Sequence, residues 1–164
     1  MGELDALVRL AEQARLALGR RGLTLSTAES CTGGLLGHVL TEVPGISEQY
    51  RGGLISYSDE LKEVELGVSN ELLARHGAVS AQACRQMAEG ARQRYTSDVA
   101  LAVTGIAGPD GGTPRKPVGL TYVGIADEHG ADVRRFVWRG DRHANKLDSA
   151  RAGLELLLER LGSA

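Results

Sequence analysis

The nine residues SDVALAVTG, at positions 97–105, predict the element that most constrains how this chain can fold. Apolar residues run without interruption from Val99 to Val103, a pattern typical of a strand that is buried on both faces of a sheet. A strand of this kind needs a layer of helices on each side. The segment therefore favours an α/β fold.

Helical and strand patterns interleave along the rest of the chain. Apolar spacing and turn residues predict helices over residues 3–20, 35–43, 59–66, 69–76, 80–95 and 147–161, and strands over residues 23–29, 52–58, 97–105, 118–127 and 131–139. The last two strands flank the short segment EHG, which predicts a hairpin. We expect a single-domain, three-layer α/β/α fold over residues 1–164, in which a mixed, mostly parallel sheet carries helices on both faces.

Composition and charge argue against several classes of function. A formal net charge of -2 and an aromatic content of 4% are unlike those of a nucleic-acid-binding protein. No segment approaches the roughly 18 consecutive apolar residues that span a membrane, and the acidic, amphipathic N-terminus is unlike a signal peptide, so we expect no membrane partner and a cytoplasmic location. Cys31 and Cys84 lie far apart, which suits free thiols, and the histidines lack the spacing of metal ligands, so we expect no metal.

Two loops that follow predicted strands hold the candidate binding groups. They are AESCTGG, residues 28–34, and TGIAGPDGG, residues 104–112. In open α/β sheets, ligands bind at the carboxyl ends of the strands, so the two loops would meet there if their strands are neighbours. The glycines of the second loop leave backbone N–H groups free to approach an anion, but the loop fits equally well as a plain surface turn.

The first loop carries the reactive side chains and allows three interpretations. Ser30 or Thr32 could simply cap the helix that begins near Gly33. Alternatively, Ser30 could be a nucleophile at the positive end of a helix, where an oxyanion is also stabilised. Cys31 is the rival nucleophile, although no histidine is evident to activate it.

The segment YSDELK, residues 57–62, offers a base for such a serine. Tyr57 ends a predicted strand, and Lys62 lies one turn into the predicted helix that follows it. A lysine accepts a proton only if burial lowers its pKa from about 10.4 toward neutrality, and lowering it by about three would cost about 4 kcal/mol. Taken alone, Lys62 fits better on a solvated helix face, as Glu63 and Glu65 beside it suggest.

These motifs together resemble the CinA C-terminal domain family. The matching segments are TAESCTGG, YSDELK, HGAVS, TGIAGPDGG with KPVG, and GDR, and the resemblance runs from about residue 4 to residue 160. Characterised members of this family are nicotinamide-nucleotide amidases. The resemblance implies a stand-alone amidase domain that converts nicotinamide mononucleotide to nicotinate mononucleotide and ammonia, with no cofactor.

The resemblance also implies roles for individual residues. Ser30 is the nucleophile, Lys62 is its general base, and Tyr57 orients or relays the proton. The substrate-binding positions that it implies are Glu29, Thr32, Gly33, Ser47, Thr104, Gly105, Ile106, Ala107, Gly108 and Arg142. Asp59 stands where asparagine is commoner in the family, and a carboxylate there would hold Lys62 charged and weaken it as a base.

Two further functions remain open at this point. The chain could be a non-catalytic module that binds a nucleotide or a partner and is linked to competence, in which case Lys62 would not be needed. It could also be a hydrolase that uses Cys31. The apolar stripes of the terminal helices could be core or interface, and we expect a homo-oligomer, with a dimer as the first choice.

Overall fold

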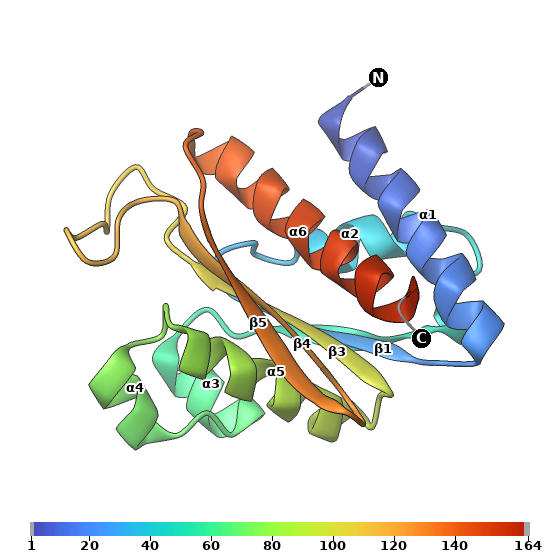
Figure 1. The fold of residues 1–164 in the computed structure, drawn as a ribbon, viewed down its shortest axis with the longest axis horizontal. Coiled ribbons are helices and arrows are strands. Elements are labelled where there is room, and N and C mark those ends of the chain that lie inside the picture. The colour runs from blue at the N-terminus through green and yellow to red at the C-terminus, as the bar shows by residue number, and fades with distance from the viewer. Residues whose placement is uncertain (1, 163–164) are drawn as a thin grey trace.

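Residues 2–162, which the computed structural model describes, are built around a five-stranded mixed sheet (Figure 1). The strands are β1 (Leu25–Glu29), β2 (Tyr50–Ile55), β3 (Val99–Gly105), β4 (Leu120–Asp127) and β5 (Gly130–Val137), in the order β2-β1-β3-β4-β5. β1 pairs in parallel with β2 and β3, whereas the β3–β4 and β4–β5 pairs are antiparallel. The sheet is therefore mixed around a parallel core, and the predicted hairpin is present.

Helices cover both faces of this sheet, which confirms the predicted three-layer α/β/α fold (Figure 1). One layer consists of α1 (Glu3–Arg21), α2 (Leu35–Thr41) and α6 (Arg142–Gly162), and the other of α3 (Asp59–Leu66), α4 (Asn70–His76) and α5 (Ala81–Tyr95). A short 3₁₀ helix, η1 (Ile46–Glu48), precedes β2. Among the described residues, no helix is long and apolar enough to cross a bilayer.

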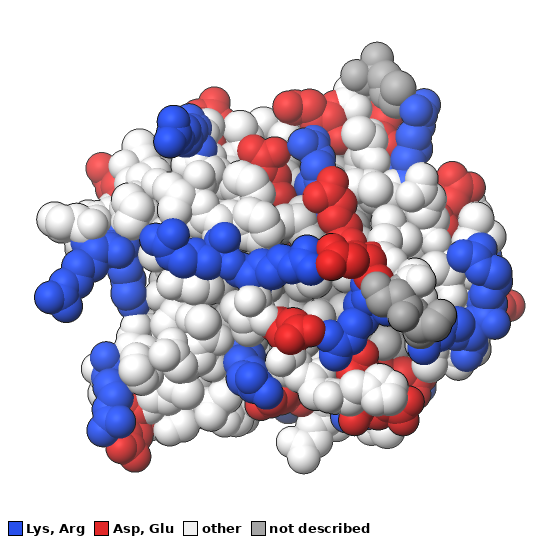
Figure 2. Space-filling view, in the orientation of Figure 1, with Lys and Arg blue, Asp and Glu red and all other residues white. Residues whose placement is uncertain are grey.

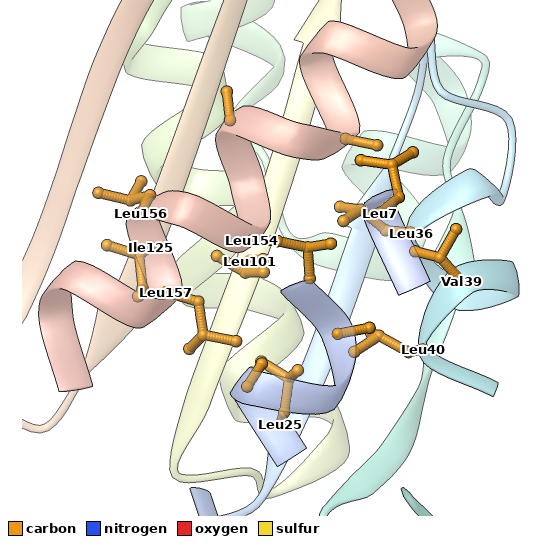
Figure 3. Packing of buried hydrophobic residues seen from close by; sticks show 14 of the residues in the cluster. Leu7, Leu25, Leu36, Val39, Leu40, Leu101, Ile125, Leu154, Leu156 and Leu157 are labelled. Carbon is orange, nitrogen blue, oxygen red and sulfur yellow. The ribbon is translucent and has the colours of Figure 1, made fainter. Parts of the chain in front are cut away.

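The strand β3 contributes side chains to both hydrophobic cores, which explains its uninterrupted apolar run. Val99, Leu101 and Val103 belong to the core shared with α1, α2 and α6. Figure 3 shows Leu101 among the leucines of these helices. Ala100 and Ala102 point to the opposite face and pack against α5 in the second core. Because alternate residues of a strand face opposite sides, burial on both sides requires an apolar residue at every position.

The observed elements differ from the predicted ones mainly at their ends. The strand predicted over residues 52–58 is Tyr50–Ile55, because Ser58 already caps α3, where its Oγ accepts a hydrogen bond from the Leu61 N–H at 3.1 Å. The last helix begins at Arg142 rather than at residue 147, because the carboxylate of Asp141 accepts the Ala144 N–H at 2.8 Å and so starts the helix earlier.

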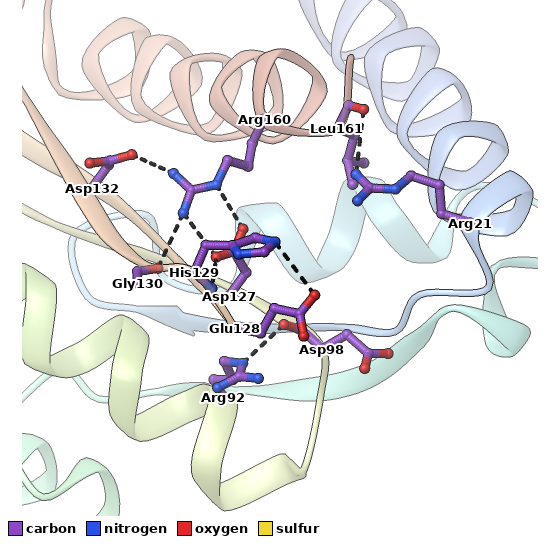
Figure 4. Close-up of polar contacts among 10 residues, drawn as sticks. All are labelled: Arg21, Arg92, Asp98, Asp127, Glu128, His129, Gly130, Asp132, Arg160 and Leu161. Carbon is purple, nitrogen blue, oxygen red and sulfur yellow. Dashed lines mark hydrogen bonds and ion pairs between the residues drawn. The ribbon is translucent and has the colours of Figure 1, made fainter. Parts of the chain in front are cut away.

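Ion pairs join α6 to the β4–β5 hairpin at the amino edge of the parallel strands (Figure 4). Arg160 donates to the two carboxylate oxygens of Asp127 at 2.7 and 2.9 Å and also pairs with Asp132. These bonds hold the pKa of Asp127 below its ordinary value. A hollow of about 180 Å³ lies here, and the Arg160 charge that borders it is paired with the two aspartates.

The strand β5 forms one edge of the sheet and has charged side chains. Figure 2 shows a row of basic side chains that crosses the molecule over β5, with acidic side chains beside it. Arg134 of β5 binds the carboxylate of Glu159 in α6 with two hydrogen bonds, one of them 2.8 Å long. Charged residues on an edge strand disfavour pairing with a foreign strand.

Candidate active site

A pocket of about 270 Å³ opens at the carboxyl edge of the parallel strands. β1 and β3 are hydrogen-bonded neighbours, with Glu29 opposite Val103, so the two loops singled out in the sequence meet at this edge, as expected. The pocket is lined by Ser30, Cys31, Tyr57, Asp59, Lys62, Ala78, Val79, Thr104, Gly105, Ile106, Ala107, Gly108, Asp110, Gly111 and Arg142.

Ser30 and Lys62 form a buried pair in the wall of this pocket. The exposed fraction is 7% for Ser30 and 1% for Lys62. The amine nitrogen Nζ of Lys62 lies 3.0 Å from the hydroxyl oxygen Oγ of Ser30. The same nitrogen also donates to two carbonyl oxygens, that of Ser56 at 2.7 Å and that of Tyr57 at 3.3 Å.

The surroundings of Lys62 favour the neutral amine. Burial lowers its pKa, and the negative charge of Asp59 opposes this shift without cancelling it. A neutral amine has two N–H donors and one lone pair. Its donors match the carbonyls of Ser56 and Tyr57, which leaves the lone pair to accept the proton of the Ser30 hydroxyl. The arrangement therefore suits a lysine that acts as a base.

The buried position of Lys62 follows from the way α3 packs. Lys62 and Leu66 are four residues apart, share one helix face and are both buried. The neighbouring acidic side chains point elsewhere, since Glu63 binds Asn70 and Glu65 pairs with Arg94. The expectation that Lys62 lies on a solvated face, taken from these glutamates, is therefore wrong.

Glu29 organises the turn that carries Ser30. Its carboxylate accepts the backbone N–H groups of Leu36 and Gly37, at 2.9 and 3.0 Å, and the hydroxyl of Thr32 at 2.7 Å. It thereby satisfies free N–H groups at the start of α2. The reading in which Ser30 or Thr32 caps this helix is wrong, because the acceptor for both N–H groups is the carboxylate of Glu29.

We expect the Glu29→Gln substitution to lower the free energy of unfolding by about 1–3 kcal/mol, because the amide loses charge and one acceptor among three buried donors. The turn that positions Ser30 should loosen as well. Chemical denaturation measures the first effect. Glu42→Gln, at the exposed C-terminal end of the same helix, is the matched control. Equal stability of the Glu29→Gln and Glu42→Gln proteins would contradict this role for Glu29.

The thiol of Cys31 reaches the pocket but is poorly suited to nucleophilic attack. Burial, with a smaller contribution from Glu29, raises the pKa of Cys31 to about 12. The thiolate is the reactive form of cysteine, and it is therefore scarce at neutral pH. The geometry favours Ser30 over Cys31 as the nucleophile.

The second loop forms the opposite wall and is held by side chains of α6. Asn145 donates to the Ala107 carbonyl at 3.0 Å, and Arg142 donates to the Gly108 carbonyl at 2.7 Å. A second nitrogen of Arg142 lies 3.4 Å from the hydroxyl of Tyr57, which is 62% exposed. Arg142 thus links the loops that follow β2 and β3 beside the pocket, where its guanidinium can meet an anionic ligand.

Ser47 is the predicted site residue that the structure places elsewhere. It lies in η1, just before β2, whereas the pocket lies beyond the opposite end of that strand. A strand of six residues separates the two places by roughly 20 Å. Glu29, Thr32 and Gly33 lie next to the site but do not line the pocket, and Glu29 acts on the turn instead.

The pocket also includes residues that the sequence did not single out for binding. Ala78 and Val79 come from the motif HGAVS, whose backbone is tied to the site because the Thr104 hydroxyl donates to the Ala78 carbonyl at 2.9 Å. Asp110 and Gly111 continue the glycine loop. The position of HGAVS within a run of motifs was the available signal, but its pairing with β3 is a tertiary contact that no local pattern reveals.

The protein is an α/β protein whose mixed sheet has a buried pair of Ser30 and Lys62 at the carboxyl edge of its parallel strands. The chain belongs to the CinA C-terminal domain family, whose model matches residues 7–161. A CinA-like protein of Geobacter sulfurreducens is 50% identical over 144 residues, which cover 88% of this chain and 35% of that protein. A CinA-like protein of Gemmatimonas aurantiaca is 48% identical over 137 residues, covering 84% and 32% respectively.

Solved structures agree with this family membership. The crystal structure of a CinA superfamily protein from Klebsiella pneumoniae 700603 has a TM-score of 0.93 and 33% identity, over 96% of this chain and 99% of that one. A competence/damage inducible protein from Agrobacterium tumefaciens has a TM-score of 0.90 and 39% identity, over 99% and 97% of the two chains. The present chain spans about a third of the length of the curated relatives that it matches.

Proposed function

We propose that this protein is an amidohydrolase that converts nicotinamide mononucleotide to nicotinate mononucleotide and ammonia. The observation that carries the proposal is the buried contact of 3.0 Å between Lys62 Nζ and Ser30 Oγ, in which burial favours the neutral amine. The substrate follows from the resemblance of the site motifs to those of nicotinamide-nucleotide amidases.

The proposed reaction begins with the transfer of the Ser30 hydroxyl proton to Lys62 Nζ. The Oγ atom attacks the carboxamide carbon and forms a tetrahedral oxyanion. The Lys62 ammonium then protonates the amine, which leaves as ammonia, and an ester to Ser30 remains. Lys62 next takes a proton from water, whose oxygen attacks the ester and forms a second tetrahedral oxyanion. When this intermediate collapses, the bond to Ser30 Oγ breaks and the Lys62 ammonium returns its proton to Oγ. The products are the acid, which ionises to the carboxylate, the Ser30 hydroxyl and the neutral Lys62 amine.

Backbone N–H groups near Ser30 are the proposed donors to the oxyanion. The N–H of Ser30 is not available, because it donates to the Val103 carbonyl at 3.0 Å, and that of Gly33 donates to the Ser30 carbonyl at 3.1 Å. The donors must therefore come from the neighbouring residues of this turn or from the glycine loop opposite. In this proposal Arg142, which lines the pocket, binds the phosphate with its guanidinium group.

A panel of amides tests the proposed function. We expect ammonia release from nicotinamide mononucleotide to exceed that from nicotinamide, asparagine and glutamine by at least about 100-fold in kcat/KM, because contacts with the remote phosphate contribute to transition-state binding. Coupled detection of ammonia measures it. Tight binding of the mononucleotide without product, across pH 6 to 9, would refute the enzyme and support a nucleotide-binding module linked to competence.

A further inference from the structure

Two carboxylates at the pocket, those of Asp59 and Asp110, have no hydrogen-bond or ion-pair partner among residues 2–162. Asp59 is the first residue of α3, and Asp110 belongs to the loop after β3. Both line the pocket and both are exposed. Within residues 2–162, neither carboxylate accepts a hydrogen bond or forms an ion pair. Elsewhere, by contrast, Asp127 and Asp132 both form ion pairs with Arg160.

The charge around the pocket is therefore unbalanced. Arg142 is the permanent cation in its lining, and the proposed base Lys62 carries no charge in the form that accepts a proton. In that form of the protein, Asp59 and Asp110 supply two negative charges against the single positive charge of Arg142. The positive end of α3 stabilises Asp59, which would be a sufficient structural reason for that residue alone. Asp110 lies in no helix, so this explanation does not extend to it.

We propose that Asp59 and Asp110 select substrates in which the ring bearing the carboxamide is positively charged, as in an N-alkylated pyridinium. An uncharged ring of the same shape would bind less well. The inference rests on the proposed function, which places the carboxamide at Ser30 and therefore the ring inside this pocket. Arg142 would meet the opposite charge, that of the phosphate, so the two signs of the lining match the two signs of the ligand.

The expected size of this selection follows from the exposure of the two carboxylates. An exposed pair of opposite charges contributes little, and two such contacts together correspond to about a 2- to 30-fold difference in affinity. Because the charges face solvent, salt should screen them. The screening length falls from about 14 Å at 0.05 M salt to about 4 Å at 0.5 M, so the selection should shrink over that range.

Binding of nicotinamide mononucleotide and of its reduced form tests the proposal. The two ligands share the ribose phosphate, whereas the reduced dihydropyridine ring has no charge. Calorimetry on the Ser30→Ala protein avoids turnover, and we expect the oxidised form to bind about 2- to 30-fold more tightly. When Asp59→Asn and Asp110→Asn are both added to the Ser30→Ala protein, the affinity ratio should fall toward one. The ratio should also fall at 0.5 M salt in the Ser30→Ala protein without these two substitutions.

Glu60→Gln is the matched control, because Glu60 follows Asp59 in the same exposed helix turn and does not line the pocket. We expect this control to keep the original ratio. Equal affinity for the two ligands, a ratio that salt leaves unchanged, or the same change in the Glu60→Gln control would overturn the charge selection alone. Failure of the unmodified protein to release ammonia from the mononucleotide would instead refute the proposed function, so the two failures are distinguishable.

Discussion

The Ser30→Ala substitution should lower kcat/KM for nicotinamide mononucleotide by about 10⁴- to 10⁶-fold, because it removes the atom that attacks the carboxamide in the proposed reaction. The fold should survive, since within residues 2–162 Oγ bonds only to Lys62, and the Lys62 amine keeps the carbonyls of Ser56 and Tyr57 as partners. Ammonia release measures the activity, and thermal unfolding shows that the variant is folded.

Cys31→Ala is the matched control for this experiment, since Cys31 is the adjacent residue and also reaches the pocket. Burial raises the pKa of its thiol to about 12 and keeps the thiolate scarce at neutral pH, so most of the activity should remain. Alkylation of the thiol that spares turnover would agree. An inactive Cys31→Ala protein beside an active Ser30→Ala protein would reverse the assignment of the nucleophile.

The fold could be predicted because its strongest constraint is local. Val99 to Val103 must be apolar at every position, since alternate side chains enter different cores. The hairpin was equally readable, because two strand patterns flank the short segment EHG, of which the structure leaves two residues in the turn. Element ends were less predictable because caps set them: Ser58 and Asp141 start their helices through single hydrogen bonds that apolar spacing does not report.

The part of the candidate site that could be predicted is the meeting of its two loops, because these loops follow neighbouring strands. The pairing of β1 with β3 brings the loop of Ser30 to the glycine loop, and chain topology favours such an arrangement. The role of Glu29 was missed, because its acceptor contacts with Leu36 and Gly37 depend on the path of the intervening turn. The expectation that Ser47 lies in the site came from its position in the sequence alone. The structure puts Ser47 before β2, whereas the pocket lies beyond the far end of this strand.

The burial of Lys62 depends partly on local sequence spacing and partly on tertiary contacts. Its four-residue spacing from Leu66 was visible in the sequence and put the two on one helix face. Glu63 and Glu65 suggested a solvated helix face instead. Their partners, Asn70 and Arg94, come from later segments and are not evident from the local sequence. A lysine is costly to bury, so its position at 1% exposure is a strong reason to look for chemistry there.

The Lys62→Met substitution should lower kcat/KM by about 10²- to 10⁴-fold, the usual contribution of a general base. Methionine keeps an unbranched chain of similar size and lacks the amine, so the loss can be attributed to proton transfer. Ammonia release with the folded variant measures it. Glu63→Gln, the next residue of α3 and one that points away from the pocket, is the control and should retain activity. A Lys62→Met protein with normal turnover would exclude Lys62 as the base.

The pH dependence gives this prediction a second, independent measurement. Because the neutral amine is the active form, kcat/KM should rise with pH through the lowered pKa of Lys62 and then level off. Asp59→Asn removes the charge that opposes this lowering, so the rise should move to lower pH. Between the lowered pKa and 10.5, the unfolded chain binds more protons than the folded one, so the free energy of unfolding should increase with pH there, and Lys62→Met should lose that increase. A rate that is flat from about pH 5 to 9 would contradict a lysine base whose pKa has moved toward neutrality.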